Sequence, residues 1–531
     1  MTAVIHSTCL VHATIYTQSV TKLSFHTVHD MLVFLILLLL ALAAAWLLSG
    51  WMRTRKYWKQ RGIPHQPTYP LIGSFTFLLR YNPAVWMRKV YAQGTEPYVG
   101  CWVFWRPALI INDPELARRI LIKDAAVFRD RFASSRPADP IGHLNMFTAK
   151  GKQWSSVRRR LTAVFTNAKM KGPFDLMRTK SKEVLQRIDA DMKSKQRIEL
   201  RTMFTDFTTD VIAGSAFGLA GDATLTGKGT LRAVTKSFME FNLFRGLAGL
   251  SIFFLPELID VFGFTAFPKN TTDLFRQIFS TILQQRGGYE TKIKENRDLF
   301  DALIKMKQES AGDNEEMSED MLVAQAAIFL LAGFDTTGSI LAFCAYELAF
   351  NQEVQDKLYK ELIKQKEKIG YADFDVESLS ELKYLDCIIN ETLRKYQPMG
   401  WLDRIALEDY KIDDHLTIEA GTPIYVNVMG IHYDPKYYPE PEKFNPDRFL
   451  DKQGDNTKGL IFVPFGEGPR SCIGRRFAMI NLRKVLSTIF LNYEVRPLPG
   501  TRKPTDVVID SRNLFLSPGE PLLVEFVKRT S

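Results

Sequence analysis

The residues of this chain best suited to chemistry lie in the stretch "FVPFGEGPRSCIGRRFA", residues 462–478, where one cysteine stands among glycines and arginines. Cys472 precedes an amphipathic run, 473–491, that is typical of a helix. Unpaired N–H groups at a helix N-terminus and nearby cations favour a thiolate. Gly466 and Gly468 permit backbone angles that other residues avoid. A thiolate is a nucleophile or a metal ligand, and this stretch alone leaves both roles open.

The number and spacing of the cysteines exclude two other kinds of site. The chain has five cysteines, and none lies close to Cys472 in the sequence. A disulfide framework or a structural zinc site needs paired spacings such as C-x2-C, which do not occur here. The pattern therefore indicates a reducing compartment and one special thiol.

A second set of polar residues lies inside a long apolar stretch, 321–350. A helix that is apolar almost all round belongs at the centre of a large protein. It contains "AGFDTT", residues 332–337, and an acid and hydroxyls are costly there unless they serve a purpose. Two interpretations stay open: Thr336 forms a hydrogen-bonded kink, or Asp335 and Thr336 form a proton relay at a ligand pocket, with Gly333 permitting close approach.

Three further charged patterns carry little information singly. "ETLR" places Glu391 and Arg394 on one helix face, and "FNPDRF" adds Arg448 in a loop that could complete a buried network. "WSSVR" places the Trp154 indole and the Arg158 guanidinium one turn apart. Such donors suit carboxylates.

Composition indicates a large globular protein. The chain has 531 residues, of which 46% are hydrophobic and 24% charged, with a formal net charge of +10. The positive balance suits an anionic membrane surface or an acidic partner. No nucleic-acid-binding motif is present, so we expect no nucleic acid partner.

Residues 31–48 form an uncharged apolar run that would span about 27 Å as a helix, enough for a bilayer core. The cations that follow it predict a membrane anchor with the next domain in the cytosol. A cleaved signal peptide is the alternative, but the basic region that should precede it is missing. The predicted organisation is an unassigned leader (1–30), a transmembrane anchor (31–52), a basic and proline-rich hinge (53–75) and a catalytic domain (76–531).

The pattern along the domain is mainly helical. Two strands are expected within 98–112, around Arg106 and Pro107, and short strands follow residue 400. The apolar stretch 241–267 is interrupted by a proline and acids, so we do not expect a second span. It predicts either a helix pair on the membrane surface or buried core.

Taken in order, W-x3-R, A-G-x-D-T-T, E-x2-R, F-x-P-x-R-F and F-G-x-G-x-R-x-C-x-G resemble the haem-thiolate monooxygenases, the cytochromes P-450. The resemblance covers roughly residues 60–530. Stretches such as "FRDRF", "ETLRKYQP" and "PFGEGPR" resemble the insect microsomal detoxifying branch. It implies a mainly α fold with small β-sheets, a single large haem-binding domain behind the N-terminal anchor helix.

The resemblance also implies roles for individual residues. Cys472 would bind the haem iron as a thiolate, and Asp335 with Thr336 would deliver protons. Glu391, Arg394 and Arg448 would lock the core beneath the haem. The remaining cofactor-binding residues would be Trp154, Arg158, Arg404, Phe465, Arg470 and Gly474.

The implied reaction inserts one oxygen atom of O2 into lipophilic substrates, with haem b as cofactor and electrons from NADPH through a flavoprotein reductase. Arg475, Arg476 and Lys484 would face that reductase, and cytochrome b5 is an additional candidate partner. We expect the endoplasmic reticulum membrane as location, and small lipophilic substrates. Five stretches would line the pocket: 128–147, 241–255, 329–337, 399–402 and 513–517.

Two other functions remain as alternatives. A haem-thiolate isomerase or dehydratase acting on peroxides needs no proton relay, so Asp335 and Thr336 argue against it. A membrane-anchored haem or lipophile carrier would not need a thiolate ligand.

Overall fold

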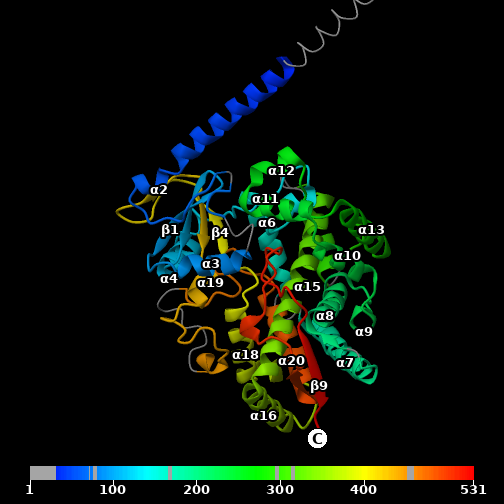
Figure 1. The fold of residues 1–531 in the computed structure, drawn as a ribbon. Coiled ribbons are helices and arrows are strands. Elements are labelled where there is room, and N and C mark those ends of the chain that lie inside the picture. The colour runs from blue at the N-terminus through cyan, green and yellow to red at the C-terminus, as the bar shows by residue number, and fades with distance from the viewer. Residues whose placement is uncertain are drawn as a thin grey trace, which may run out of the picture.

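The computed structural model describes residues 31–530 except 71, 76–80, 166–169, 196, 294–297, 313–316 and 451–459. The predicted leader, 1–30, lies outside the described residues. Helices dominate and three small sheets accompany them (Figure 1), which confirms the predicted fold class.

A long central helix organises the helical body. Its hydroxyl N-cap is Ser318, which accepts a hydrogen bond from the Met321 N–H. The main helices are α6 (Gly151–Thr162), α7 (Lys171–Lys193), α8 (Leu200–Phe217), α10 (Thr230–Met239), α11 (Leu243–Phe254), α12 (Pro256–Phe262), α13 (Lys269–Gln285), α14 (Leu299–Glu309), α15 (Glu319–Phe350), α16 (Gln352–Lys368), α18 (Lys383–Lys395) and α20 (Arg475–Asn492). Shorter ones are α3 (Pro83–Tyr91), α4 (Pro114–Arg118), α5 (Pro140–Leu144), α9 (Ala223–Thr226), α17 (Val376–Ser380) and α19 (Val428–His432).

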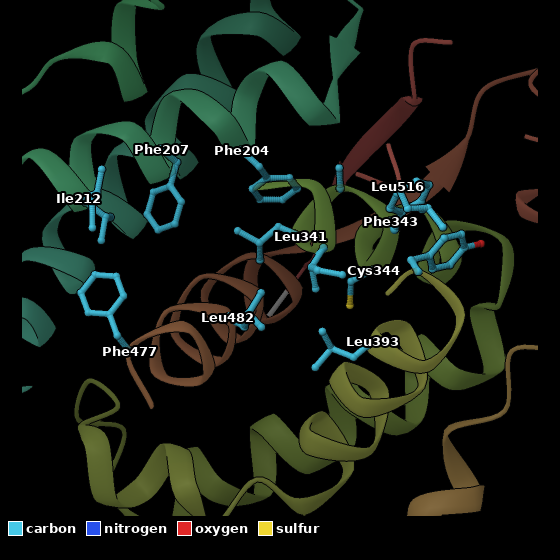
Figure 2. Close-up of a cluster of buried hydrophobic side chains, with 14 of the residues drawn as sticks. Phe204, Phe207, Ile212, Leu341, Phe343, Cys344, Leu393, Phe477, Leu482 and Leu516 are labelled. Carbon is cyan, nitrogen blue, oxygen red and sulfur yellow. The ribbon is translucent and has the colours of Figure 1, made fainter. Parts of the chain in front are cut away.

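Two glycines let the central helix α15 lie tightly against α8. A Cβ at Gly338 would stand 2.9 Å from a Thr205 methyl carbon, and one at Gly333 would stand 2.8 Å from the Ile212 side chain. Figure 2 shows side chains from α8, α15, α18 and α20 meeting in one apolar cluster, with Leu341 of α15 near its centre. Burial of these side chains fixes the helices that carry the polar motifs.

The largest sheet has the order β1-β2-β7-β4. Strands β1 (Tyr98–Val103) and β2 (Arg106–Ile111) are antiparallel, β2 pairs in parallel with β7 (Pro423–Val426), and β4 (Leu402–Ile405) is antiparallel to β7. The predicted pair of strands is confirmed, but the turn lies at Phe104 and Trp105, ahead of Arg106. The other sheets are β3 (Ile198–Glu199), β9 (Leu523–Lys528) and β8 (Tyr493–Pro497), and the pair β5 (Tyr410–Lys411) and β6 (Thr417–Ile418).

The N-terminal helix, Met31–Gln60, projects from the domain, and its final turn is α2 (Tyr57–Gln60) (Figure 1). The Trp58 indole N–H donates to the Cys101 carbonyl at 2.9 Å, and the Trp102 indole N–H donates to the Thr54 carbonyl at 2.9 Å. The Gln66 N–H bonds to the Gly100 carbonyl. Parts of the segment predicted as a hinge, 53–75, therefore pack on β1.

The apolar stretch after α10 forms α11 and α12, on the same side of the domain as the N-terminal helix (Figure 1). Ile252 and Phe254 are buried, whereas Leu243 and Val261 are about three-quarters exposed. The buried-core alternative therefore holds for one face, while the other face is exposed and the membrane-surface alternative stays a prediction. Among the described helices, only the N-terminal helix and α15 are long and apolar enough to span a membrane, and α15 is mostly buried inside the domain.

Candidate active site

The cysteine loop adopts the tight turns that its glycines predict. Gly466 and Gly468 have positive φ angles, 68° and 74°. A Cβ at Gly468 would lie 1.9 Å from the Leu121 carbonyl oxygen, so only glycine fits there. The Cys472 N–H donates to the Phe465 carbonyl at 2.8 Å and closes the loop.

The Cys472 sulfur lies inside the protein, yet its surface is open because it faces an internal cavity. Burial raises the pKa of the thiol, while the N–H groups of Gly474 and Arg475 and the charge of Arg158 lower it. The helix N-terminus acts in the predicted direction but does not outweigh burial. A thiolate here needs a cation at the sulfur, and a metal-bound thiol is deprotonated.

The cavity has a volume of about 350 Å³. Cys472, Phe465 and Gly474 line it from the cysteine loop, and Ala332 and Thr336 line it from α15. Most of the remaining lining is apolar. The site therefore combines one soft sulfur donor with walls that exclude water.

Only three of the five predicted pocket stretches contribute to this lining, through residues such as Phe147, Phe329 and Met399. The stretches 241–255 and 513–517 do not line it in the described part of the chain. Phe253 packs one layer behind, with its ring 5.7 Å from that of Phe147.

Trp154 and Arg158 of α6, which were predicted to meet the propionates of a haem, line the cavity together with Arg470 of the cysteine loop. The Arg470 guanidinium stacks 4.0 Å from the Trp154 ring centroid. It also bonds to Asp130 at 3.2 Å and to the Ala149 carbonyl at 2.8 Å. Burial and the neighbouring charge of Arg131 lower the pKa of Arg470 to about 9.

Arg404 lies deeper than its predicted role suggests. It is 2% exposed, donates to the Asp403 carbonyl at 2.7 Å and is not part of the cavity lining. Burial and Arg131 lower the pKa of Arg404 to about 9. Arg131, which the sequence did not single out, lines the cavity itself and pairs with Asp403 at 2.9 Å. These buried cations have fewer anions around them than their charge requires.

The polar insertion in α15 divides between two environments. The Thr336 hydroxyl lines the cavity and donates to the Ala332 carbonyl at 2.6 Å, within an α-helix that stays continuous. Asp335 does not line the cavity; its carboxylate is 3.2 Å from the Arg201 guanidinium at the start of α8. Gly333, expected to leave room for a ligand, lines the cavity and also meets Ile212 of α8.

Glu391, Arg394 and Arg448 come together as expected. Arg394 forms two hydrogen bonds to the Glu391 carboxylate, at 2.7 and 2.8 Å, and Arg448 approaches it at 3.3 Å. Glu391 and Arg394 have no exposed surface. Arg394 also donates to the His432 and Pro441 carbonyls, both at 2.8 Å.

His432 links this network to the cysteine loop. Its Nε2 accepts the Val463 N–H at 3.2 Å, and its Nδ1 faces the Arg394 carbonyl at 3.3 Å. Burial and the nearby Arg394 charge lower the pKa of His432 to about 3, so the ring is neutral. A lone histidine in "GIHYDP" carries no pattern by which the sequence could reveal this position.

The surface expected to meet a reductase is only partly as predicted. Arg475 and Arg476, at the start of α20, are exposed. Lys484 is 2% exposed and its Nζ is 2.7 Å from Asp373, so it belongs to the core instead of the surface. Helix periodicity turns this position inward, and Asp373 supplies the charge partner.

Comparison with known proteins decides the family. The family model described as Cytochrome P450 matches residues 63–526. The chain belongs to the cytochrome P450 family. Similar proteins are Cytochrome P450 6k1 of Blattella germanica, 32% identical over 90% of this chain and 93% of the relative, and Cytochrome P450 6l1 of the same species, 34% identical over 88% and 92%. Probable cytochrome P450 6a19 of Drosophila melanogaster is 34% identical over 90% and 95%.

As a cytochrome P450, the chain is a haem-thiolate monooxygenase that resembles the insect detoxifying branch. The residues around the cavity fit haem. Cys472 presents a soft donor, and within the described residues no cluster of three acidic, histidine or cysteine side chains could hold a metal ion by itself. The under-compensated guanidiniums, with the pKa values of Arg404 and Arg470 lowered to about 9, suit the two propionate groups of a porphyrin.

Proposed function

We propose that Cys472 is the single protein ligand of a haem iron in a membrane-anchored monooxygenase that oxidises small lipophilic substrates. The observation that carries this proposal is the Cys472 sulfur, which faces a cavity shared with Thr336 and with the buried arginines. When bound, haem b activates dioxygen, and the thiolate favours cleavage of the O–O bond. Trp154, Arg158 and Arg470 would hold the propionates from the cavity, while Arg404 would contribute positive charge from behind Asp403.

Proton delivery is assigned to Asp335 and Thr336. The Thr336 hydroxyl faces the cavity and can accept one proton while donating another. Asp335 directly precedes it in α15, and its partner Arg201 is partly exposed, with 23% of its side-chain surface accessible. Protons would pass from solvent near Arg201 to Asp335 and then to Thr336, while the apolar lining excludes bulk water.

Electrons would come from NADPH through a flavoprotein reductase, with cytochrome b5 as a second candidate donor. Arg475 and Arg476 are exposed beside the cysteine ligand and suit an acidic docking surface. The cations after the N-terminal helix favour a cytosolic domain on the endoplasmic reticulum membrane. The exposed apolar faces of α11 and α12 would rest on that membrane.

One spectrum and one assay test this function. The reduced protein with carbon monoxide should show the absorption band of a thiolate-ligated haem, and NADPH with reductase should then drive product formation that requires O2. A protein that binds haem without the thiolate band would contradict the ligand assignment. Turnover of a hydroperoxide with no need for NADPH or O2 would instead support the isomerase or dehydratase alternative.

A further inference from the structure

A second cavity, of about 760 Å³, lies between the end of the N-terminal helix, the β1–β2 turn and the start of α12. We call it the anchor cleft and define it by Arg53, Trp105, Arg106, Lys150 and Glu257, with Glu419 on its rim. It shares no lining residue with the cavity at Cys472. A ligand of the anchor cleft would therefore be distinct from any ligand of the cavity at Cys472.

The N-terminal helix borders the anchor cleft and sets the position of the cleft relative to a bilayer. Trp105 at the β1–β2 turn meets Trp46 edge to face with 6.1 Å between ring centroids, and a Cβ at Gly50 would touch it at 3.8 Å. Arg53 lies five residues beyond the apolar run, roughly 8 Å further along a helix. Headgroups occupy roughly 5–8 Å outside the hydrocarbon core, and tryptophans favour this boundary. The cleft thus opens at headgroup depth if the helix spans the bilayer.

The donors that face the anchor cleft are incompletely matched by the protein. The Lys150 ammonium has no direct hydrogen-bond or ion-pair partner among the described residues, and burial lowers its pKa despite the more distant charges of Asp130 and Asp403. The Trp105 indole N–H is buried and also without a partner in that part of the chain. Within the described residues, the Arg53 side chain bonds only to the Ser49 hydroxyl, at 3.2 Å. A half-buried ammonium beside an unpaired N–H is suited to an anionic oxygen ligand.

The carboxylates in the cleft narrow the choice of ligand. Glu257 is ion-paired with Arg106 across the mouth, and Glu419 bonds to Arg61 at 3.2 Å. Each pair uses one carboxylate oxygen, Oε1, and among the described residues the second oxygen of each carboxylate has no partner. A free phosphate would bring only acceptors to these oxygens, whereas a headgroup with both a phosphate and an ammonium would also supply donors for them. We propose that the anchor cleft binds the headgroup of a zwitterionic aminophospholipid such as phosphatidylethanolamine, its phosphate near Lys150 and Arg53 and its ammonium near Glu257.

The test uses the full-length haem-loaded protein in nanodiscs of phosphatidylethanolamine and phosphatidylglycerol, followed by native mass spectrometry of the phospholipid that stays bound. Wild type should retain phosphatidylethanolamine, and Lys150→Met should retain it roughly tenfold less, as expected for one lost charged hydrogen bond. The Lys150 side chain makes no helix-cap hydrogen bond, so α6 should still form. Lys152→Met, an exposed neighbour outside the cleft, is the matched control.

Two further experiments distinguish a lipid headgroup from inorganic phosphate as the ligand of the cleft. Glu257→Gln should reduce the preference for phosphatidylethanolamine over phosphatidylglycerol, because the ammonium loses its carboxylate. Glycerophosphoethanolamine should displace the retained lipid, and inorganic phosphate at equal concentration should not. Equal displacement by inorganic phosphate, or equal retention by wild type and Lys150→Met, would overturn the proposal.

The proposal rests on the membrane anchoring proposed above, and the two can fail separately. Protein that stays with membranes but retains no aminophospholipid would overturn the cleft assignment alone. Protein that does not associate with membranes at all would overturn the anchoring itself, and the cleft assignment with it.

Discussion

On the Cys472 side of the cavity, Glu391 and Arg394 are fully buried and joined by two short hydrogen bonds, with further donors closing around them. On the α15 side, Asp335 has one ion pair, with partly exposed Arg201, and Thr336 has one hydrogen bond within its own helix. The first side is held in one geometry. The second leaves acid and hydroxyl able to change partners, which proton transfer requires.

The largest expected effect comes from replacing Cys472, whose sulfur faces the cavity. Cys472→His should abolish the thiolate band of the reduced carbon monoxide complex and all NADPH-driven turnover, because imidazole does not supply the same electron donation. Cys344→Ala, in the apolar cluster of Figure 2, is the matched control and should keep the band. Normal turnover by Cys472→Ser would disprove the assignment.

The buried pair of Glu391 and Arg394 should be sensitive to substitution. Glu391→Gln should lower the free energy of unfolding by about 3–5 kcal/mol, because Arg394 is left as an uncompensated buried charge. Glu381→Gln breaks the exposed pair with Lys368 and should lower stability far less, because solvent screens that pair. Denaturant unfolding measures both, and similar losses for the two variants would refute the contrast between locked and exposed pairs.

The α15 side should show the opposite pattern, with stability kept and chemistry lost. Asp335→Asn should slow turnover by about 10²-fold, because one proton donor is removed. Thr336→Ala should keep haem and substrate binding while NADPH consumption yields hydrogen peroxide instead of product.

Two controls belong to this prediction. Asp320→Asn changes an exposed acid in the first turn of the same helix and should leave turnover unchanged. Thr336→Ser keeps the hydroxyl and should restore coupling. If Asp335→Asn and Thr336→Ala both couple NADPH to product as wild type does, the insertion is only structural.

His432 should make the free energy of unfolding depend on pH in the acidic range. Its pKa is about 3 in the folded protein against 6.5 ordinarily, so below pH 6.5 the unfolded chain gains a proton that the folded one does not. Its contribution to stability is complete above about pH 6.5 and is lost by about 1.4 kcal/mol per pH unit as pH falls toward 3. His432→Gln should reduce the measured acid slope by up to that amount, and exposed His415→Gln should not.

The smallest effect is expected at the surface. Charge reversal by Arg475→Glu with Arg476→Glu should raise the reductase concentration for half-maximal rate several-fold, more at low salt. Lys484→Met should instead lower stability and leave that concentration unchanged, because Lys484 is buried against Asp373. An unchanged reductase requirement in the double variant would remove both arginines from the interface.

The sequence predicted those features that depend on local pattern. The turns at Gly466 and Gly468, the buried helix α15 and the Glu391 pair with Arg394 follow from residue type and short spacing. Family resemblance then brought distant motifs such as Trp154 and Arg470 to one cavity.

Features that depend on a distant partner could not be predicted. Asp335 turns toward Arg201, 134 positions away, and Arg131 pairs with Asp403, 272 positions away. Nothing in the local pattern of either residue identifies its partner. The docking of Trp58 on β1 could not be predicted for the same reason, since nothing in the sequence around Trp58 identifies Cys101 as its partner.

The two indole hydrogen bonds, from Trp58 to β1 and from Trp102 of β1 back to Thr54, have a consequence for electron supply. A domain on a slack tether would tumble and present every face to its neighbours. This domain is coupled to its helix, so if the helix spans a bilayer as proposed, the height and tilt of the domain over that bilayer are set together. A reductase in the same membrane would then search in two dimensions, and the effective concentration of correctly oriented pairs would depend on matching heights.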